Sequence, residues 1–210
     1  MANLVPAIDL AVLAASLPAG WLLRVFARWQ IEGKVNISLI LTIAGCVAVA
    51  AWSVAVMPAD ALLPVGCLLG WSLLALGIID AIAFRLPDVL TLPLAAAGLL
   101  LSFFLPDAAP LNHLIGAAAG FFAFYGIAVL YARARGREGL GLGDAKLVAA
   151  AGAWLGWAAL PYIVLIGCAG AFAWIGVSAM RRGKAALREQ VPFGVPLCFA
   201  LWLVWLYGPL

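Results

Sequence analysis

Apolar residues run almost without interruption along the chain, and only short polar stretches break them. A membrane-spanning helix needs roughly 20 mostly apolar residues. Eight runs approach that length, at 4–23, 36–57, 61–84, 88–106, 112–131, 145–160, 162–180 and 192–208. The pattern predicts an all-α, polytopic membrane helix bundle of about eight transmembrane helices, forming a single domain over 1–210. The pattern is also consistent with six or seven spans, because the sixth run is short and Pro161 separates it only weakly from the seventh.

The composition agrees with this membrane assignment. Of the 210 residues, 67% are hydrophobic and 10% are charged, whereas a soluble domain is typically about 45–50% apolar and about 25% charged. These values exclude a soluble enzyme, a disordered chain, a secreted disulfide scaffold and a free nucleic-acid-binding domain. Membrane lipid is therefore an expected partner, and nucleic acid is not.

The 12 lysines and arginines are not spread evenly between the predicted spans. They lie in alternate connections or at their edges, near 24–35, 85–87, 132–146 and 181–190. The other connections contain Asp60, Asp107 and His113 but no lysine or arginine. Because cations accumulate in cytoplasmic loops, we expect the four basic connections to face the cytoplasm and both termini to be extracytoplasmic.

The cysteines and the single histidine indicate no metal site and no cofactor. The cysteines lie singly inside predicted spans, without the paired spacing of zinc ligands or of a disulfide framework; they are Cys46, Cys67, Cys168 and Cys198. We interpret them as small packing residues. His113 lies at the outer end of the fifth span and is interpreted as a loop or interface residue.

Three aspartates lie at the predicted cytoplasmic ends of spans: Asp80, Asp88 and Asp144. An ionisable residue within a membrane span is costly, and it indicates a functional site by default. Asp88 follows Pro87 and is well explained as a helix N-cap. Asp80 is also explained if it pairs with Arg85 or with a neighbouring helix.

Asp144 follows glycines at every second position, in Gly141-Leu-Gly143-Asp144, and it begins a span. Helix capping is an equally good explanation for it. Interfacial anchoring explains Arg85 and Lys146.

However, two carboxylates on one side of a membrane also suit aspartic proteolysis, in which the pair shares a proton. One carboxylate activates water and the other donates a hydrogen bond to the scissile carbonyl, so neither a metal nor a covalent intermediate is needed.

Three stretches of the chain resemble the bacterial prepilin peptidases (type IV leader peptidases), which are GxGD-type membrane aspartic proteases. In the order of that family they are Ile79-Asp80 through Leu86-Pro87-Asp88-Val-Leu-Thr-Leu-Pro93, then Gly141-Leu-Gly143-Asp144-Ala-Lys146-Leu with Gly152-Ala-Trp-Leu-Gly156, then Val191-Pro192-Phe193-Gly194. The resemblance covers about residues 65–208. Three motifs in order are far more specific than the short GxGD string alone.

The resemblance implies that Asp80 and Asp144 are the catalytic pair. It implies cleavage of a short, positively charged leader from type IV prepilins or type II secretion pseudopilins. Cleavage would occur at the cytoplasmic face of the bacterial inner membrane, after a glycine and without a cofactor. The remaining motif positions would support the site; they are Arg85, Pro87, Asp88, Gly141, Gly143, Lys146, Pro192, Phe193 and Gly194.

Two departures from the family pattern have consequences. Larger members have a long first cytoplasmic loop with zinc-binding cysteines, and they also N-methylate the new amino terminus. Here that loop is about 24–35 and contains no cysteine, so we expect a short form with peptidase activity and no N-methyltransferase activity. In addition, the family often has Pro-Phe-Gly-Pro where this chain has Pro192-Phe193-Gly194-Val195-Pro196, which we interpret as a mark of a subtype.

Two other functions are consistent with parts of the pattern. A proton-coupled transporter could use Asp80 and Asp144 as a proton relay. Carrier sites, however, usually lie near the midplane, often between inverted repeats, whereas these aspartates lie at one border and no repeat is visible. A non-catalytic scaffold in which Asp88 and Asp144 only cap helices is the third interpretation.

Overall fold

The computed structural model describes residues 5–33, 35–57, 61–105, 109–136, 140–183 and 190–208. This part of the chain contains eight α-helices and no strand, which confirms the predicted all-α bundle. They are α1 (Val5–Gln30), α2 (Leu39–Val56), α3 (Leu63–Ala83), α4 (Asp88–Ser102), α5 (Pro110–Arg135), α6 (Leu142–Leu155), α7 (Leu160–Arg182) and α8 (Gly194–Tyr207).

Five of these helices are long and apolar enough to cross a membrane: α1, α2, α3, α5 and α7, the last extended by a 3₁₀ turn at Trp157–Ala159. The helices α4, α6 and α8 are shorter. The predicted boundary between the sixth and seventh spans was wrong. The chain turns at Gly156, whose φ of +78° favours glycine. Pro161 lies in the first turn of α7, where its missing N–H has no consequence.

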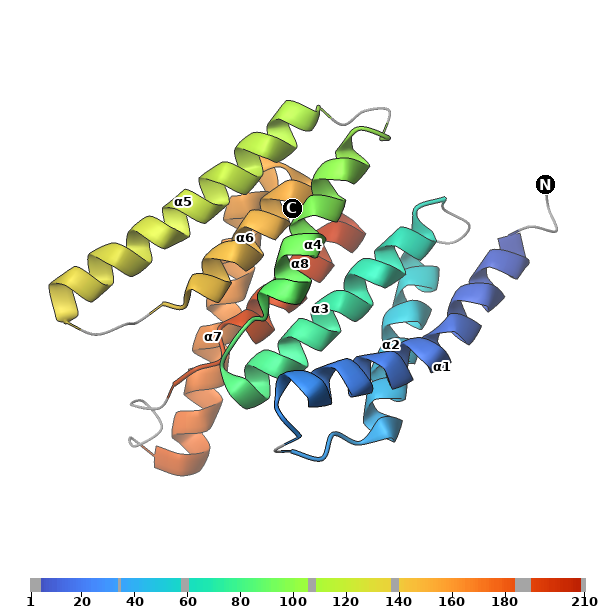
Figure 1. The fold of residues 1–210 in the computed structure, drawn as a ribbon, viewed down its shortest axis with the longest axis horizontal. Coiled ribbons are helices and arrows are strands. Elements are labelled where there is room, and N and C mark those ends of the chain that lie inside the picture. The colour runs from blue at the N-terminus through green and yellow to red at the C-terminus, as the bar shows by residue number, and fades with distance from the viewer. Residues whose placement is uncertain are drawn as a thin grey trace.

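Two groups of helices pack together (Figure 1). The larger group buries one apolar core between α3, α4, α6, α7 and α8, with α5 packed on α6. The helices α1 and α2 form an antiparallel pair that packs on α3 and buries smaller clusters there. The helix α3 therefore contributes to both groups, and its C-terminal end lies between them.

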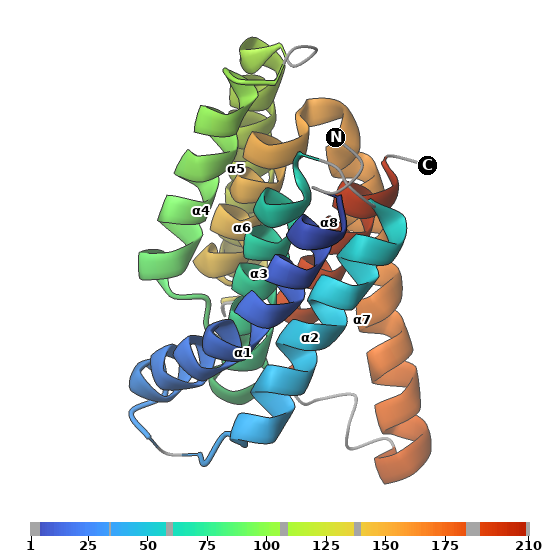
Figure 2. The ribbon, with the colours of Figure 1, turned by 90° about the vertical axis from the view of Figure 1, so that its right-hand side faces the viewer.

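Successive helices run in alternating directions (Figure 2). The start of α1 and the end of α8 lie at one end of the bundle. The helix ends that flank the four basic connections lie at the opposite end of the bundle. This arrangement agrees with the predicted alternation, although which end faces the cytoplasm stays a prediction. Several charged loop residues used for that prediction lie outside the described residues: Lys34, Asp60, Asp107, Arg137, Glu138, Lys184, Arg188 and Glu189.

The helices α5 and α6 approach each other very closely at their glycines. A Cβ on Gly152 would lie 2.2 Å from the carbonyl carbon of Gly116, and a Cβ on Gly120 would lie 2.9 Å from the carbonyl oxygen of Val148. Side chains at these positions would separate the two backbones. The small-residue pattern is thus used for helix packing, as small residues are in membrane bundles.

His113 corrects one interpretation. It is not a loop residue, because it is buried near the start of α5 and its Nδ1 lies 2.9 Å from the carbonyl oxygen of Ala153 in α6. The cysteines Cys46, Cys67 and Cys198 are buried and free, in agreement with a packing role. Cys168 is only partly buried.

Candidate active site

Asp80 lies in the last turn of α3, and its side chain is 5% exposed. The backbone N–H of Val195, in the first turn of α8, donates a hydrogen bond to its Oδ2 at 3.2 Å. The backbone of Gly194 lies directly beside the same carboxylate, so that a Cβ there would be 2.8 Å from Oδ2. The N-terminal turn of α8 therefore forms one wall around Asp80, and its N–H groups favour a negative charge there.

Asp144 lies in the first turn of α6 and is partly buried. Its Oδ2 accepts a hydrogen bond of 3.3 Å from the backbone N–H of Gly141. Asp144 therefore does cap its own helix, as one interpretation of the sequence predicted. The capping bond does not remove the carboxylate from the site, because the same side chain lines a cavity that Asp80 also reaches.

One cavity of about 590 Å³ brings the two aspartates together. Asp80 reaches this cavity from α3 and Asp144 from α6, and the two carboxylates are close enough to interact electrostatically. The wall is otherwise mostly apolar. The cavity is lined by Asp80, Phe84, Leu140, Gly141, Asp144, Cys168, Ala171, Phe172, Ile175, Gln190, Val191 and Phe193.

Arg85 does not pair with Asp80. Its guanidinium instead donates a hydrogen bond to the carbonyl oxygen of Gln30, at the end of α1. Of the two partners that the sequence left open for Asp80, Arg85 is therefore wrong, and a neighbouring helix, α8, is confirmed. The reason is local: α3 ends at Phe84, which has a left-handed backbone (φ 51°), and Arg85 follows that turn toward α1.

Asp88 and Lys146 also differ from their predicted roles. The N-cap of α4 is Pro87, in an extended conformation, and no side chain caps this helix. Asp88 is the first helical residue, and both of its oxygens accept from Lys146 Nζ, at 2.6 and 2.7 Å. Asp88 is thus not an N-cap, and Lys146 is bound to α4 instead of serving only as an interfacial anchor.

The third motif also reaches the site. Pro192 is buried just before α8, and Phe193 lines the cavity and stacks on Phe124 of α5, with ring centroids 6.4 Å apart. Gly194 then contacts Asp80. The three motifs therefore meet at one end of the bundle, although the sequence separates them widely.

Sequence reasoning missed two contributors. Val195 was interpreted as a mark of a subtype, yet its N–H is the donor to Asp80. A proline has no N–H to donate, so the departure from Pro-Phe-Gly-Pro was a usable signal. The apolar wall from α7, formed by Ala171, Phe172 and Ile175, has the spacing of one helix face. These three residues are apolar like most of the chain, so nothing in the sequence distinguished them as part of a site.

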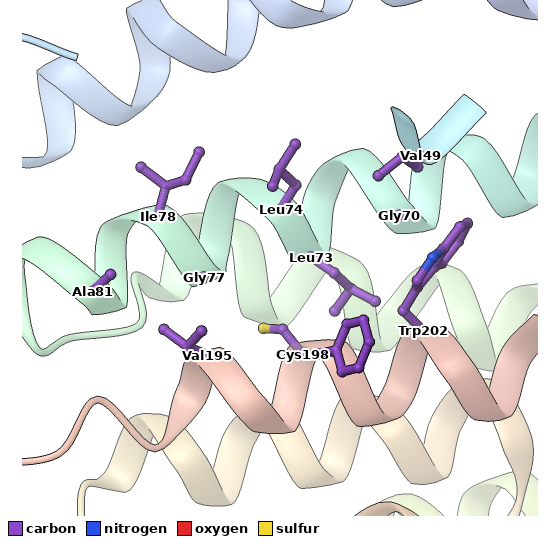
Figure 3. A pocket seen from close by; sticks show the side chains of 11 residues that line it. Val49, Gly70, Leu73, Leu74, Gly77, Ile78, Ala81, Val195, Cys198 and Trp202 are labelled. Carbon is purple, nitrogen blue, oxygen red and sulfur yellow. The ribbon is translucent and has the colours of Figure 1, made fainter. Parts of the chain in front are cut away.

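A second cavity, of about 340 Å³, lies between α2, α3 and α8 (Figure 3). Apolar side chains such as Leu73, Val195 and Trp202 line it, and no carboxylate does. The two aspartates therefore line the first cavity and not this one.

Comparison with known proteins identifies the family of the chain. The model of the type IV leader peptidase family matches residues 67–176, which include both aspartates. The chain is 41% identical over 142 residues to a prepilin leader peptidase/N-methyltransferase of Aeromonas hydrophila, covering 67% of this chain and 48% of that protein. It is 47% identical over 123 residues to the protein of that name from Burkholderia pseudomallei strain K96243, covering 59% and 40%. Against the Pseudomonas aeruginosa protein of that name, identity is 40% over 142 residues, covering 67% and 48%.

No solved structure matches the chain. The chain spans about half the length of the curated relatives it matches. The family match covers more than half of the chain, and the helices within it position both carboxylates. This multi-pass membrane protein belongs to the type IV leader peptidase family.

Proposed function

We propose that this protein is a membrane aspartic endopeptidase that removes the short leader from type IV prepilins or type II secretion pseudopilins. The observation that carries the proposal is that Asp80 of α3 and Asp144 of α6 line one cavity and interact electrostatically. Family membership and the names of the relatives support it. We place the protein in the bacterial inner membrane, with the cavity at the cytoplasmic face.

In the proposed reaction, Asp80 and Asp144 share one proton. The ionised carboxylate takes a proton from a water molecule, and the oxygen of that water attacks the scissile carbonyl carbon. The protonated carboxylate donates a hydrogen bond to the carbonyl oxygen. Collapse of the tetrahedral intermediate breaks the C–N bond, and a proton passes to the leaving amine. The cleavage yields a free leader carboxylate and a new amino terminus.

The walls of the cavity suit a substrate that changes from polar to apolar at the cleaved bond. The α7 side supplies Ala171, Phe172 and Ile175, whereas Gln190 lies at the polar edge. An apolar helix that follows the leader would lie against the apolar wall. The leader would then extend past the carboxylates toward the connections between helices.

Family membership favours this reaction over the proton-coupled transporter. The two carboxylates also lie near helix ends, in the last turn of α3 and the first turn of α6, and not at mid-span. The capping bond on Asp144 is compatible with the scaffold interpretation. The scaffold interpretation gives no role to Asp80, a buried carboxylate that lines the same cavity.

The test is cleavage of a prepilin by the purified protein in lipid nanodiscs, followed by mass spectrometry. The variants are Asp80→Asn and Asp144→Asn, with Asp9→Asn as the matched carboxylate control on α1. We expect wild type and Asp9→Asn to release the leader. Each site variant should lose at least about 10²-fold in rate, since proton transfer by a positioned group typically contributes about 10²–10⁴-fold. Full activity in either site variant would contradict the proposal.

A further inference from the structure

We propose that Asp88 and Lys146 are positioning residues of this peptidase. Their ion pair holds the segment that carries Asp144 against the α3–α4 connection, and so sets where the Asp144 carboxylate lies relative to Asp80. The inference rests on the proposed function for its catalytic consequence. Its structural part is measurable without a substrate.

The ion pair joins α4 and α6 near their N-terminal ends. Lys146 Nζ lies 2.6 Å and 2.7 Å from the two oxygens of Asp88, a residue 58 positions away in the chain. The Asp88 side chain is 55% exposed and that of Lys146 is 27% exposed. An exposed ion pair of this kind contributes little to stability, so we infer a role in positioning the two segments and not in stabilising the fold.

A second contact joins the same two segments. Gly143 precedes Asp144, and a Cβ on it would lie 3.0 Å from the Cβ of Leu86 and 3.4 Å from the backbone nitrogen of Leu86. Leu86 lies two residues before Asp88, and Gly143 lies three residues before Lys146. The backbone contact and the ion pair therefore flank Asp144 and restrain both the distance and the rotation of the start of α6.

The α3–α4 connection also reaches the other carboxylate. The Cδ1 of the buried Leu86 lies 3.2 Å from the Cβ position of Gly194, and that same position is 2.8 Å from Asp80 Oδ2. Leu86 thus lies between the Asp144 segment and the α8 turn that surrounds Asp80. A displacement of the α3–α4 connection would change the relation between the two carboxylates.

Asp144 has little else to orient it. The hydrogen bond that the structure gives its carboxylate comes from Gly141 of the same turn, at 3.3 Å. That bond fixes the side chain to α6, so the position of α6 determines the position of the carboxylate. A misplacement of about 1 Å can cost about 10²-fold in rate, and a restraint on the first turn of α6 is therefore a catalytic requirement.

The kinetic test uses the variants Asp88→Asn, Lys146→Gln and the double variant in nanodiscs. Each single variant should lower kcat for prepilin cleavage about 10- to 100-fold with KM changed less than about 3-fold. The double variant should be no worse than the more damaged single, because both changes break the same interaction. Lys146→Arg should keep most of the activity, because a guanidinium can also bind both oxygens.

The matched control is Arg133→Gln. Arg133 is an exposed cation in the last turn of α5, and its removal changes the charge equally without touching the α4–α6 contact. We expect wild-type kcat. Additive effects of Asp88→Asn and Lys146→Gln, or losses that match a lower folded fraction, would overturn the positioning role.

A structural readout separates this inference from the proposed function. Two spin labels are attached at Phe84→Cys and Leu140→Cys, in a protein that also carries Cys168→Ala. The distance between them is measured across the cavity that these residues line. Dipolar EPR should give one narrow distance with the ion pair intact, and a shifted or broader one in Asp88→Asn. An unchanged distribution would overturn the inference even if wild type cleaves prepilin. A wild type that cleaves nothing, with labels that still respond to Asp88→Asn, would count against the proposed function alone.

Discussion

The backbone of Gly194 lies against the carboxylate of Asp80, and no side chain fits between them. A Cβ at residue 194 would lie 2.8 Å from Oδ2 and 2.9 Å from Cγ of Asp80. Gly194 does not have a positive φ, so glycine is required here for space and not for backbone conformation. The glycine of the third motif is thus explained by its contact with a residue of the first.

Replacing Gly194 with alanine should therefore damage catalysis. Because the added methyl would displace the Asp80 carboxylate or the start of α8, we expect Gly194→Ala to lower the rate of prepilin cleavage at least about 10²-fold. The measurement is kcat in nanodiscs, compared with the melting temperature of the same preparation. Gly126→Ala in α5 is the control, since nothing lies within 4 Å of its Cβ position. A Gly194→Ala protein with wild-type kcat would refute this reading of the contact.

The close contact between α5 and α6 predicts a defect of stability. A Cβ on Gly152 would lie 2.2 Å and 2.3 Å from the carbonyl carbon and oxygen of Gly116. These are backbone atoms, which cannot move aside as a side chain can. We expect Gly152→Ala to destabilise the protein by about 1–3 kcal/mol or more, measured by thermal unfolding in detergent. Gly176→Ala, which has open space at its Cβ position, should leave the melting temperature unchanged or raise it.

His113 should affect stability and leave the chemistry intact. Its Nδ1 bonds to the carbonyl oxygen of Ala153 near the end of α6 that is opposite Asp144. His113→Leu removes that bond, and we expect a loss of about 0.5–1.5 kcal/mol with kcat of the folded protein unchanged. His113→Asn should recover part of the stability, because its side-chain amide can occupy a similar place. A fall in kcat at equal folded fraction would show that the histidine acts on the site.

The absence of cysteine from residues 24–35 predicts that the cleaved product keeps an unmodified amino terminus. The measurement is the intact mass of mature pilin made with this protein as the sole processing enzyme. S-adenosylmethionine should be present, and a full-length relative should serve as the positive control. A product heavier by one methyl group would contradict the prediction.

Much of the fold could be predicted from the sequence, because each helix is a continuous apolar run and few charges interrupt it. The helix ends were predicted less well. The break at Gly156 depends on a backbone conformation that glycine permits. A hydropathy pattern carries no signal for such a conformation. Similarly, α6 begins at Leu142 because the GxGD segment is itself the first turn of the helix.

The candidate site was found from the scarcity of charge, since Asp80 and Asp144 are costly in a membrane. The contacts that surround this pair were predicted only in part. The bond between Asp88 and Lys146 joins helices that are distant in the sequence, and local rules favoured capping for the first and anchoring for the second. The donor in the hydrogen bond from Val195 is a backbone N–H, so the type of side chain at this position does not predict the bond.

The close approach of α5 and α6 has a consequence for how a substrate enters. Backbone contact at Gly116 and Gly152, together with the bond from His113, holds the C-terminal half of α6 in place, and the Asp88–Lys146 pair holds its start. The C-terminal half of α7 is different: beyond Ala171 its residues are mostly exposed, and Gly176 faces open space. The side of the bundle that carries Asp144 is thus closely packed, whereas the α7 side, which forms the apolar wall of the cavity, is more open. We expect an incoming helix to be admitted by displacement of α7, while the carboxylate it must reach stays still.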